Sequence, residues 1–144
     1  MINCKYEWWE TIVSFPNIQE NGIQAITTEH HLLDEPSFSA AEERITKEML
    51  PYIHNGDMTI KDIKRRKYEA VIGDGHYDFW YSIKGSYVFP DEKNDREKTY
   101  KSLFLVNAHT LQEACDIFIK AANTGMIEYS IIECKLTEIH EIYR

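Results

Sequence analysis

The sequence predicts an α+β fold built from an internally duplicated ββαβ unit: two strands, one helix and a third strand. Four apolar positions with helical spacing recur in the second half: Phe38, Ala41, Ile45 and Met49 correspond to Leu111, Ala114, Phe118 and Ala122. Four strand positions recur in the same way: Ile60, Ile63, Tyr68 and Val71 correspond to Ile131, Cys134, Ile139 and Ile142. Such self-similarity indicates that each copy is one structural unit. We therefore expect a single domain, residues 1–144, made of two pseudo-symmetric repeats at about 4–73 and 78–143.

The strands of the first half are predicted from side-chain type. Aromatic and β-branched residues dominate positions 4–15, which suits a pleated, half-buried surface. Pro16 then opens a loop, and residues 23–33 form a second strand. The apolar rhythm of residues 58–72 predicts the third strand of this half.

The helix of the first half is predicted from its cap and its apolar stripe. Ser37 is a suitable N-cap, because its side chain can accept a hydrogen bond from the first helical turn. Apolar residues then follow one face over residues 38–50, and Pro51 ends the helix.

The second half repeats this order. Residues 77–89 and 100–106 read as strands joined by a polar hairpin loop at residues 90–98. Thr110 and Glu113 form a capping box at the start of the second helix, and residues 127–143 form the last strand. Pairing the two copies predicts a six-stranded, mainly antiparallel sheet with two helices packed on it. Strand order does not follow from the sequence.

Composition narrows the class of protein. The 144 residues are 43% hydrophobic, which excludes a disordered chain and suffices for one core. No apolar run is long enough to cross a bilayer, so no membrane association is expected. An odd count of 3 cysteines and the lack of an apolar leader predict reduced thiols in the cytoplasm. With 24 acidic against 16 basic residues, the net charge of −8 opposes general binding to a phosphate backbone.

No motif predicts catalysis, a cofactor or a metal site. The chain contains no glycine-rich phosphate loop, no nucleophile elbow and no histidine pair with ligand spacing. His30 and His31 are adjacent, so on a strand they point to opposite faces and do not share an ion. We therefore expect a protein that is not an enzyme.

Two sets of residues are candidate contact sites. Trp8 and Trp9 are adjacent on a strand, so one of them lies away from the main core and could anchor a protein partner; the alternative is that both are core. The basic stretch 61–68 could bind single-stranded nucleic acid or a nucleotide through five cations and a stacking ring, namely Lys61, Lys64, Arg65, Arg66, Lys67 and Tyr68. Its alternative is an edge strand that is charged to prevent unwanted pairing.

Several short patterns resemble those of one family. They are Tyr6-Glu7-Trp8-Trp9, Leu33-Asp34 with Ser37–Glu42, Ile63-Lys64-Arg65, Trp80–Ile83 and Leu105–Ala108. Together they resemble a domain-of-unknown-function family of small proteins from gut anaerobes and their bacteriophages. Members usually carry an acidic residue where this chain has Ala40, which affects a helix cap and not function. The resemblance implies no activity, but it implies a phage-related protein that acts inside a cell.

These observations lead to two hypotheses of function. The first is a non-enzymatic binding protein, phage-encoded and cytoplasmic, that acts by contact with a host or phage protein through Trp8 or Trp9 and through its edge strands. Free sheet edges also make a homodimer reasonable. The second is a binder of single-stranded nucleic acid or nucleotide that uses residues 61–68.

Overall fold

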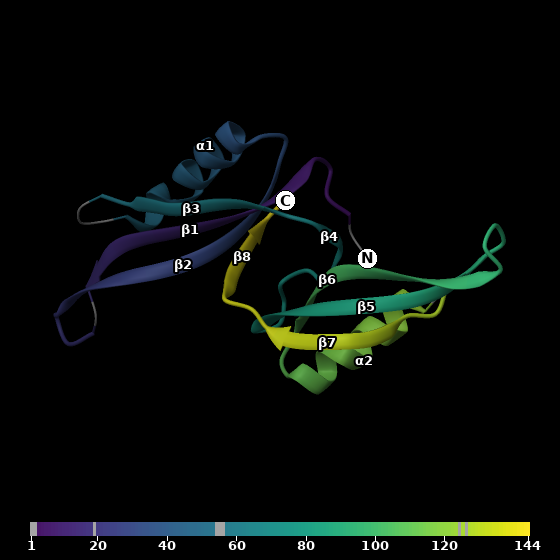
Figure 1. The fold of residues 1–144 in the computed structure, drawn as a ribbon. Coiled ribbons are helices and arrows are strands. Elements are labelled where there is room, and N and C mark those ends of the chain that lie inside the picture. Colours follow the sequence, from purple (N-terminus) through teal and green to yellow (C-terminus); the bar gives the residue numbers. More distant parts are fainter. Residues whose placement is uncertain (1–2, 19, 54–56, 124, 126) are drawn as a thin grey trace. The chain divides into compact units, whose positions relative to one another are not determined.

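The computed structural model describes residues 3–18, 20–53, 57–123, 125 and 127–144. These residues form two four-stranded sheets with one long helix against each, which confirms the predicted α+β class (Figure 1). The chain divides into two compact units. We call residues 4–67 with 138–144 the N-terminal unit, and the unit that consists mainly of residues 68–137 the C-terminal unit.

The N-terminal unit contains a sheet with the strand order β3-β1-β2-β8. Strand β1 pairs antiparallel with β2 and β3, whereas β8 pairs parallel with β2. Helix α1 packs on one face of this sheet and continues into the short 3₁₀ helix η1. The elements are β1 (Glu7–Ile18), β2 (Gln24–Glu35), α1 (Phe38–Met49), η1 (Leu50–Tyr52), β3 (Thr59–Arg66) and β8 (Ile139–Tyr143).

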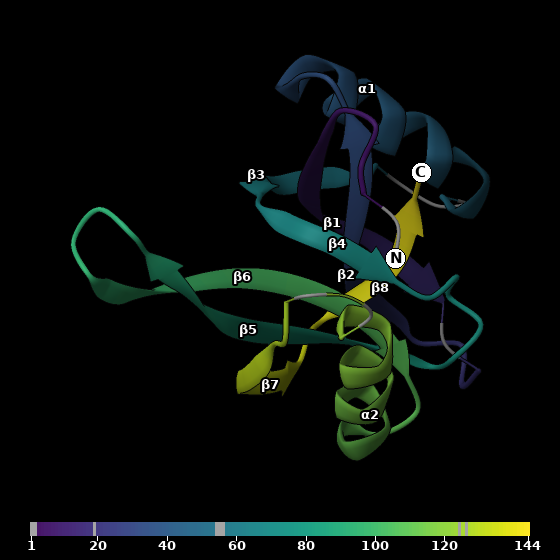
Figure 2. The same cartoon turned by 90° about the vertical axis from the view of Figure 1, so that its right-hand side faces the viewer.

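The C-terminal unit contains a sheet with the strand order β4-β6-β5-β7. Strand β5 pairs antiparallel with β6 and β7, whereas β4 pairs parallel with β6. Helix α2 packs on one face of this sheet (Figure 2). The elements are β4 (Tyr68–Ile72), β5 (Phe79–Asp91), β6 (Arg96–Ala108), α2 (Leu111–Ala122) and β7 (Ser130–Leu136).

The predicted long strands at residues 58–72 and 127–143 were wrong, because each is two strands in two different sheets. The first breaks at Lys67 into β3 and β4, and the second breaks at Thr137 and Glu138 into β7 and β8. The described residues therefore contain eight strands in two sheets instead of the six expected. Neither stretch contains a glycine or a proline, so no local turn signal reveals that the chain changes partners there.

The first hairpin is longer than expected, since Pro16 lies inside β1. Pro16 pairs with Ile26 of β2. The pairing of β1 with β3 has already ended at Ser14. At that point β1 is an edge strand, where a proline costs no ladder hydrogen bond. The second hairpin likewise continues to Asp91 and resumes at Arg96, so its polar loop is shorter than predicted.

The two sheets share more than their strand order. The order β3-β1-β2-β8 is matched by β7-β5-β6-β4, with a helix after the second strand of each hairpin. Both sheets also have a shift in strand register at the equivalent place. In the first sheet the residue after the shift is Val13, which pairs with Ile60; in the second it is Gly85, which pairs with Ile131. This register lets positions of the two units be compared one by one. The internal duplication itself stays a prediction.

The helix caps are confirmed. The Ser37 hydroxyl accepts a hydrogen bond from the Ala40 N–H at 3.1 Å, and the Thr110 hydroxyl accepts one from the Glu113 N–H at 3.1 Å. Behind the caps, three of the four predicted apolar positions of each helix are buried, whereas the first position, Phe38 or Leu111, is exposed. The core under α1 contains Val13, Phe15, Leu33, Ala41, Ile45 and Met49. The core under α2 contains Ala70, Ile72, Tyr81, Ile83, Phe104, Val106, Ala108, Ala114, Phe118 and Ala122.

None of the helices within the described ranges combines the length and the apolar character that a membrane span needs.

Candidate functional site

The two tryptophans are placed on opposite faces of β1, and neither is exposed. Trp8 faces away from α1 and is only 1% exposed. Trp9 faces α1, where it is half-buried, donates from Nε1 to the Glu35 carbonyl at 2.8 Å and packs edge-to-face on Phe38. Phe38, at 48% exposure, is the aromatic side chain that reaches solvent here. The sequence could not show this, because alternation does not tell whether both faces of a strand are covered.

The predicted basic site is divided between the two sheets. Lys61, Lys64, Arg65 and Arg66 lie on β3 and Lys67 follows it, but Tyr68 begins β4 in the other sheet. Three of the cations contact carboxylates: Lys64 with Asp62 at 3.3 Å, Arg65 with Glu7 at 2.6 Å and Arg66 with Glu10 at 3.3 Å. Lys61 and Lys67 are exposed. Paired cations present little net charge to a phosphate backbone, so this strand is a weaker phosphate site than its sequence suggests.

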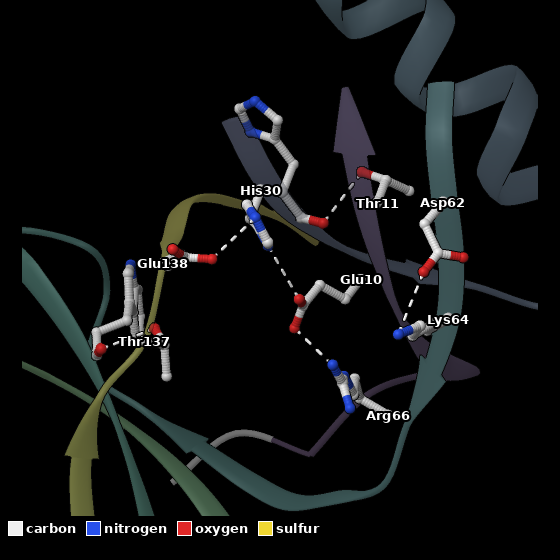
Figure 3. A network of polar contacts seen from close by, with 10 residues as sticks. Glu10, Thr11, His30, Asp62, Lys64, Arg66, Thr137 and Glu138 are labelled. Carbon is white, nitrogen blue, oxygen red and sulfur yellow. Dashed lines mark hydrogen bonds and ion pairs between the residues drawn. The ribbon is translucent and has the colours of Figure 1, made fainter. Parts of the chain in front are cut away.

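Arg66 belongs to a chain of polar contacts on the face of the sheet opposite α1 (Figure 3). Glu10 lies between Arg66 and the Nδ1 atom of His30, which is 3.1 Å away, and Nε2 of His30 lies 3.1 Å from Glu138. The chain of contacts links β1, β2, β3 and the segment before β8, so we interpret it as a structural tie.

A pocket of about 340 Å³ lies on the opposite face of the same sheet, beyond the end of α1. Every residue that lines it belongs to the N-terminal unit, and strands β1, β2 and β8 supply most of the wall. We call it the histidine pocket. Its lining residues are Phe15, Asn17, Thr27, Glu29, His31, Met49, Tyr52, His140, Glu141 and Tyr143.

His31 is the least satisfied polar side chain of this pocket. It is 1% exposed, and neither ring nitrogen has a hydrogen-bond partner. Burial, followed by the nearby His140 and His30, lowers the pKa of His31 to about 4, so the ring is neutral near pH 7. A neutral imidazole carries one donor and one acceptor. Leaving such groups buried without partners costs about 1 to 3 kcal/mol.

Glu29 joins the two histidines of the pocket. Its Oε1 atom lies 3.7 Å from Nε2 of His31, and its Oε2 atom lies 3.5 Å from Nε2 of His140. The three side chains come from β2 and β8, strands far apart in the sequence. The rings of His140 and Tyr143 pack on the His31 ring, each with a centroid distance of 5.6 Å.

Tyr143 reports the electrostatic character of this region. Burial, together with the negative charges of nearby carboxylates, first Glu141, then Glu48, with Glu29 in addition, raises the pKa of Tyr143 to about 12. A field that opposes formation of a phenolate is a negative one. The histidine pocket therefore combines carboxylates, aromatic rings and a neutral, unpartnered imidazole.

The corresponding place in the C-terminal unit is filled. The parallel pairing of β2 with β8 is irregular just before His31, and that of β6 with β4 is irregular just before Phe104. Phe104 therefore stands where His31 stands. It is buried and packs edge-to-face on Phe118 at 4.8 Å and on Tyr129 at 5.3 Å. The same place thus holds an aromatic core in one unit and a polar pocket in the other.

Sequence reasoning missed this pocket. His31 and Glu29 lie two residues apart on one face of a strand, which was a visible signal, but it is a weak one. The decisive partner, His140, arrives only because β8 pairs with β2, and this pairing has no local signature. Within the described part of the chain, no three His, Cys, Asp or Glu side chains are grouped so that they could hold a metal ion.

Comparison with known proteins identifies a family. No curated protein and no solved structure matches this chain. A family model described as a domain of unknown function, DUF4494, matches residues 7–144, which include all the strands and helices described above. The chain therefore belongs to the DUF4494 family.

Proposed function

We propose that this protein is a non-enzymatic binding protein that acts by contact with another protein. The observation that supports the proposal is the exposure of large apolar side chains at the free ends of both hairpins. We call residues 15–18 with 23–27 the first tip and residues 87–91 with 96–100 the second tip. In each tip the two strands pair only with each other, since the third and fourth strands end before it.

Both tips expose large apolar side chains to solvent. Ile26 is 68% exposed in the first tip, together with Ile18 and Ile23. Val88 is 55% exposed in the second tip, together with Phe89. A two-stranded ribbon is marginally stable alone, and grouped apolar exposure marks interaction surfaces. The tips therefore replace the tryptophans as the proposed anchors.

The cellular setting is part of the proposal. The family resemblance supports an origin in a gut anaerobe or its bacteriophage, with a partner in the cytoplasm of the infected cell. Cys4, Cys115 and Cys134 are free thiols, which suits a reducing compartment. A second copy of the chain is one partner that the tips could bind.

The test is quantitative capture of partners with matched variants. The double variant Ile26→Lys with Phe89→Lys should lose the bound protein, because each change places a charge in an apolar contact. Asn94→Lys, in the loop of the second hairpin, is the control that adds charge without removing an apolar side chain. Sedimentation equilibrium should show whether the partner is another copy. Equal capture by wild type and by the double variant would refute the tips as the contact.

The nucleic-acid alternative is checked in parallel. We expect no saturable change in the anisotropy of labelled single-stranded oligonucleotides at about 50 mM salt, where phosphate contacts bind most strongly. Binding that weakens at about 200 mM salt, and that Arg65→Glu with Arg66→Glu abolishes, would favour that alternative instead.

A further inference from the structure

We propose that the histidine pocket binds the ammonium or guanidinium group of a small organic cation. Phe15, Asn17 and Thr27 of the first tip line this pocket, but the proposal does not depend on the exposed apolar side chains of the tips. It rests on three features of the pocket: an unpartnered buried imidazole, a largely buried carboxylate and a wall of aromatic rings.

The imidazole requires a partner. His31 is almost fully buried, lines the pocket and makes no hydrogen bond through either nitrogen. Buried polar groups in folded proteins are nearly always hydrogen-bonded, and an exception requires an explanation. Both ring nitrogens are themselves buried, so a ligand with N–H donors would satisfy the unprotonated one when the pocket wall opens around the ring.

The carboxylates determine the charge of the ligand. Glu29 and Glu141 both line the pocket, and the side chain of Glu29 is only 18% exposed. Among the lining residues, His140 is the side chain that could balance the charge of Glu29, but it is 62% exposed, so solvent screens the interaction. His31 supplies no compensating positive charge because burial keeps it neutral. A buried carboxylate without a strong local counter-ion favours a positive ligand.

The aromatic rings suit the same ligand. Phe15, Tyr52 and Tyr143 line the pocket, and the face of an aromatic ring attracts a cation within about 6 Å. A volume of about 340 Å³ lies at the small end of the range for ligand pockets, which suits a small amine or guanidine. Asn17 and Thr27 add neutral oxygen acceptors to the wall.

The experiment is calorimetric titration of the full chain with agmatine, which carries both an ammonium and a guanidinium group. Acetate is the matched anion probe, and Zn²⁺ is the metal probe. We expect saturable binding of agmatine, no binding of acetate and no tight binding of Zn²⁺. Agmatine binding should weaken at least about 10-fold in Glu29→Gln, which removes the charge and keeps the shape. Thermal unfolding of each variant verifies that it is folded.

His31→Phe is the second variant and Glu133→Gln is the control. The first should abolish agmatine binding while the protein stays folded, because the ring fills the space as Phe104 does in the other unit. Glu133, an exposed carboxylate on β7 of the C-terminal unit, should be replaceable without effect. Capped arginine and capped lysine distinguish the source of the cation. If they bind as well as agmatine, the natural ligand is a side chain of a protein partner; if only agmatine binds, it is a free amine.

Three results would overturn the proposal. The first is no binding of agmatine, capped arginine or capped lysine at concentrations up to about 1 mM, the weakest affinity of interest. The second is equal affinity for agmatine in wild type and in Glu29→Gln. The third is tight Zn²⁺ binding that His31→Phe abolishes, which would make the pocket a metal site.

Discussion

The two units have the same strand order and the same register, yet one equivalent position is part of the core in one unit and lines a pocket in the other. In the C-terminal unit Phe104 packs on Phe118 and Tyr129 and completes the core under α2. In the N-terminal unit the equivalent His31 faces a pocket and makes no hydrogen bond. The filled unit shows what this fold does when the position serves only stability. The open unit leaves an unsatisfied polar ring at this position, which costs about 1 to 3 kcal/mol.

Gly85 helps to explain how the aromatic core fits. A Cβ atom at Gly85 would lie 2.9 Å from Cζ of Phe118 and 3.2 Å from Cδ1 of Tyr129. The equivalent position on β1 is Val13, which carries a side chain into the core under α1. The aromatic rings of the C-terminal unit therefore occupy space that the valine side chain takes in the other sheet.

The largest expected effect comes from placing the histidine in the filled unit. Phe104→His should lower the free energy of unfolding by about 4 kcal/mol, because it removes apolar contacts and buries unpartnered nitrogens. Urea unfolding followed by circular dichroism measures it. Phe79→His, at an exposed position of the same sheet, is the control and should change stability by less than about 0.5 kcal/mol. A loss below about 1 kcal/mol for Phe104→His would mean that this fold tolerates a buried imidazole at little cost.

The next largest effect is a pH dependence of the free energy of unfolding that arises from His31 in the N-terminal unit. The pKa of His31 is lowered to about 4, so its contribution to stability is present above the unfolded value of 6.5 and is lost as the pH falls from 6.5 to 4. The loss should reach about 3 kcal/mol. Unfolding curves of wild type and of His31→Phe across this range measure it by difference. Parallel pH profiles for the two proteins would show that the His31 ring titrates normally.

A smaller effect tests the space around the aromatic core. Gly85→Ala should destabilise the protein by about 2 kcal/mol, because Phe118 and Tyr129 must move away from the added methyl group. Chemical denaturation of the single variant measures the loss. Combining it with Phe118→Leu gives a double-mutant cycle, and the coupling should be favourable because leucine leaves room for the methyl group. If the stability losses of the two single variants simply add, the loss in Gly85→Ala does not come from contact with Phe118.

The smallest effect has the opposite sign. His31→Phe should raise the free energy of unfolding at neutral pH by about 1 kcal/mol, because it replaces an unsatisfied polar ring with an apolar one of similar size. A higher midpoint of thermal unfolding is the measurement. His31→Ala is the comparison, since it removes the polar ring but leaves a cavity, and it should not stabilise the protein. Destabilisation by phenylalanine would show that the pocket wall depends on the imidazole.

The parts of the fold that depend on local sequence were predictable, and the parts that depend on distant pairing were not. Ser37 and Thr110 identified both helix starts, because a cap is a contact within one turn. The break at Lys67 was missed because no glycine or proline marks it, although the buried run Ala70-Val71-Ile72 is typical of a covered parallel strand. The candidate site shows the same limit, because three of its ten lining residues lie on β2 and three lie on the distant strand β8.

The pairing of β8 with β2 has a consequence for the order of folding. Strands β1 and β2 form a hairpin and β3 follows after one helical segment, but β8 must return across almost the whole sequence to reach β2. Closing so long a loop is entropically costly, so this edge is expected to form late and slowly. His140 and Tyr143 lie on that strand. During synthesis the polypeptide therefore has most of its first sheet long before it has a histidine pocket.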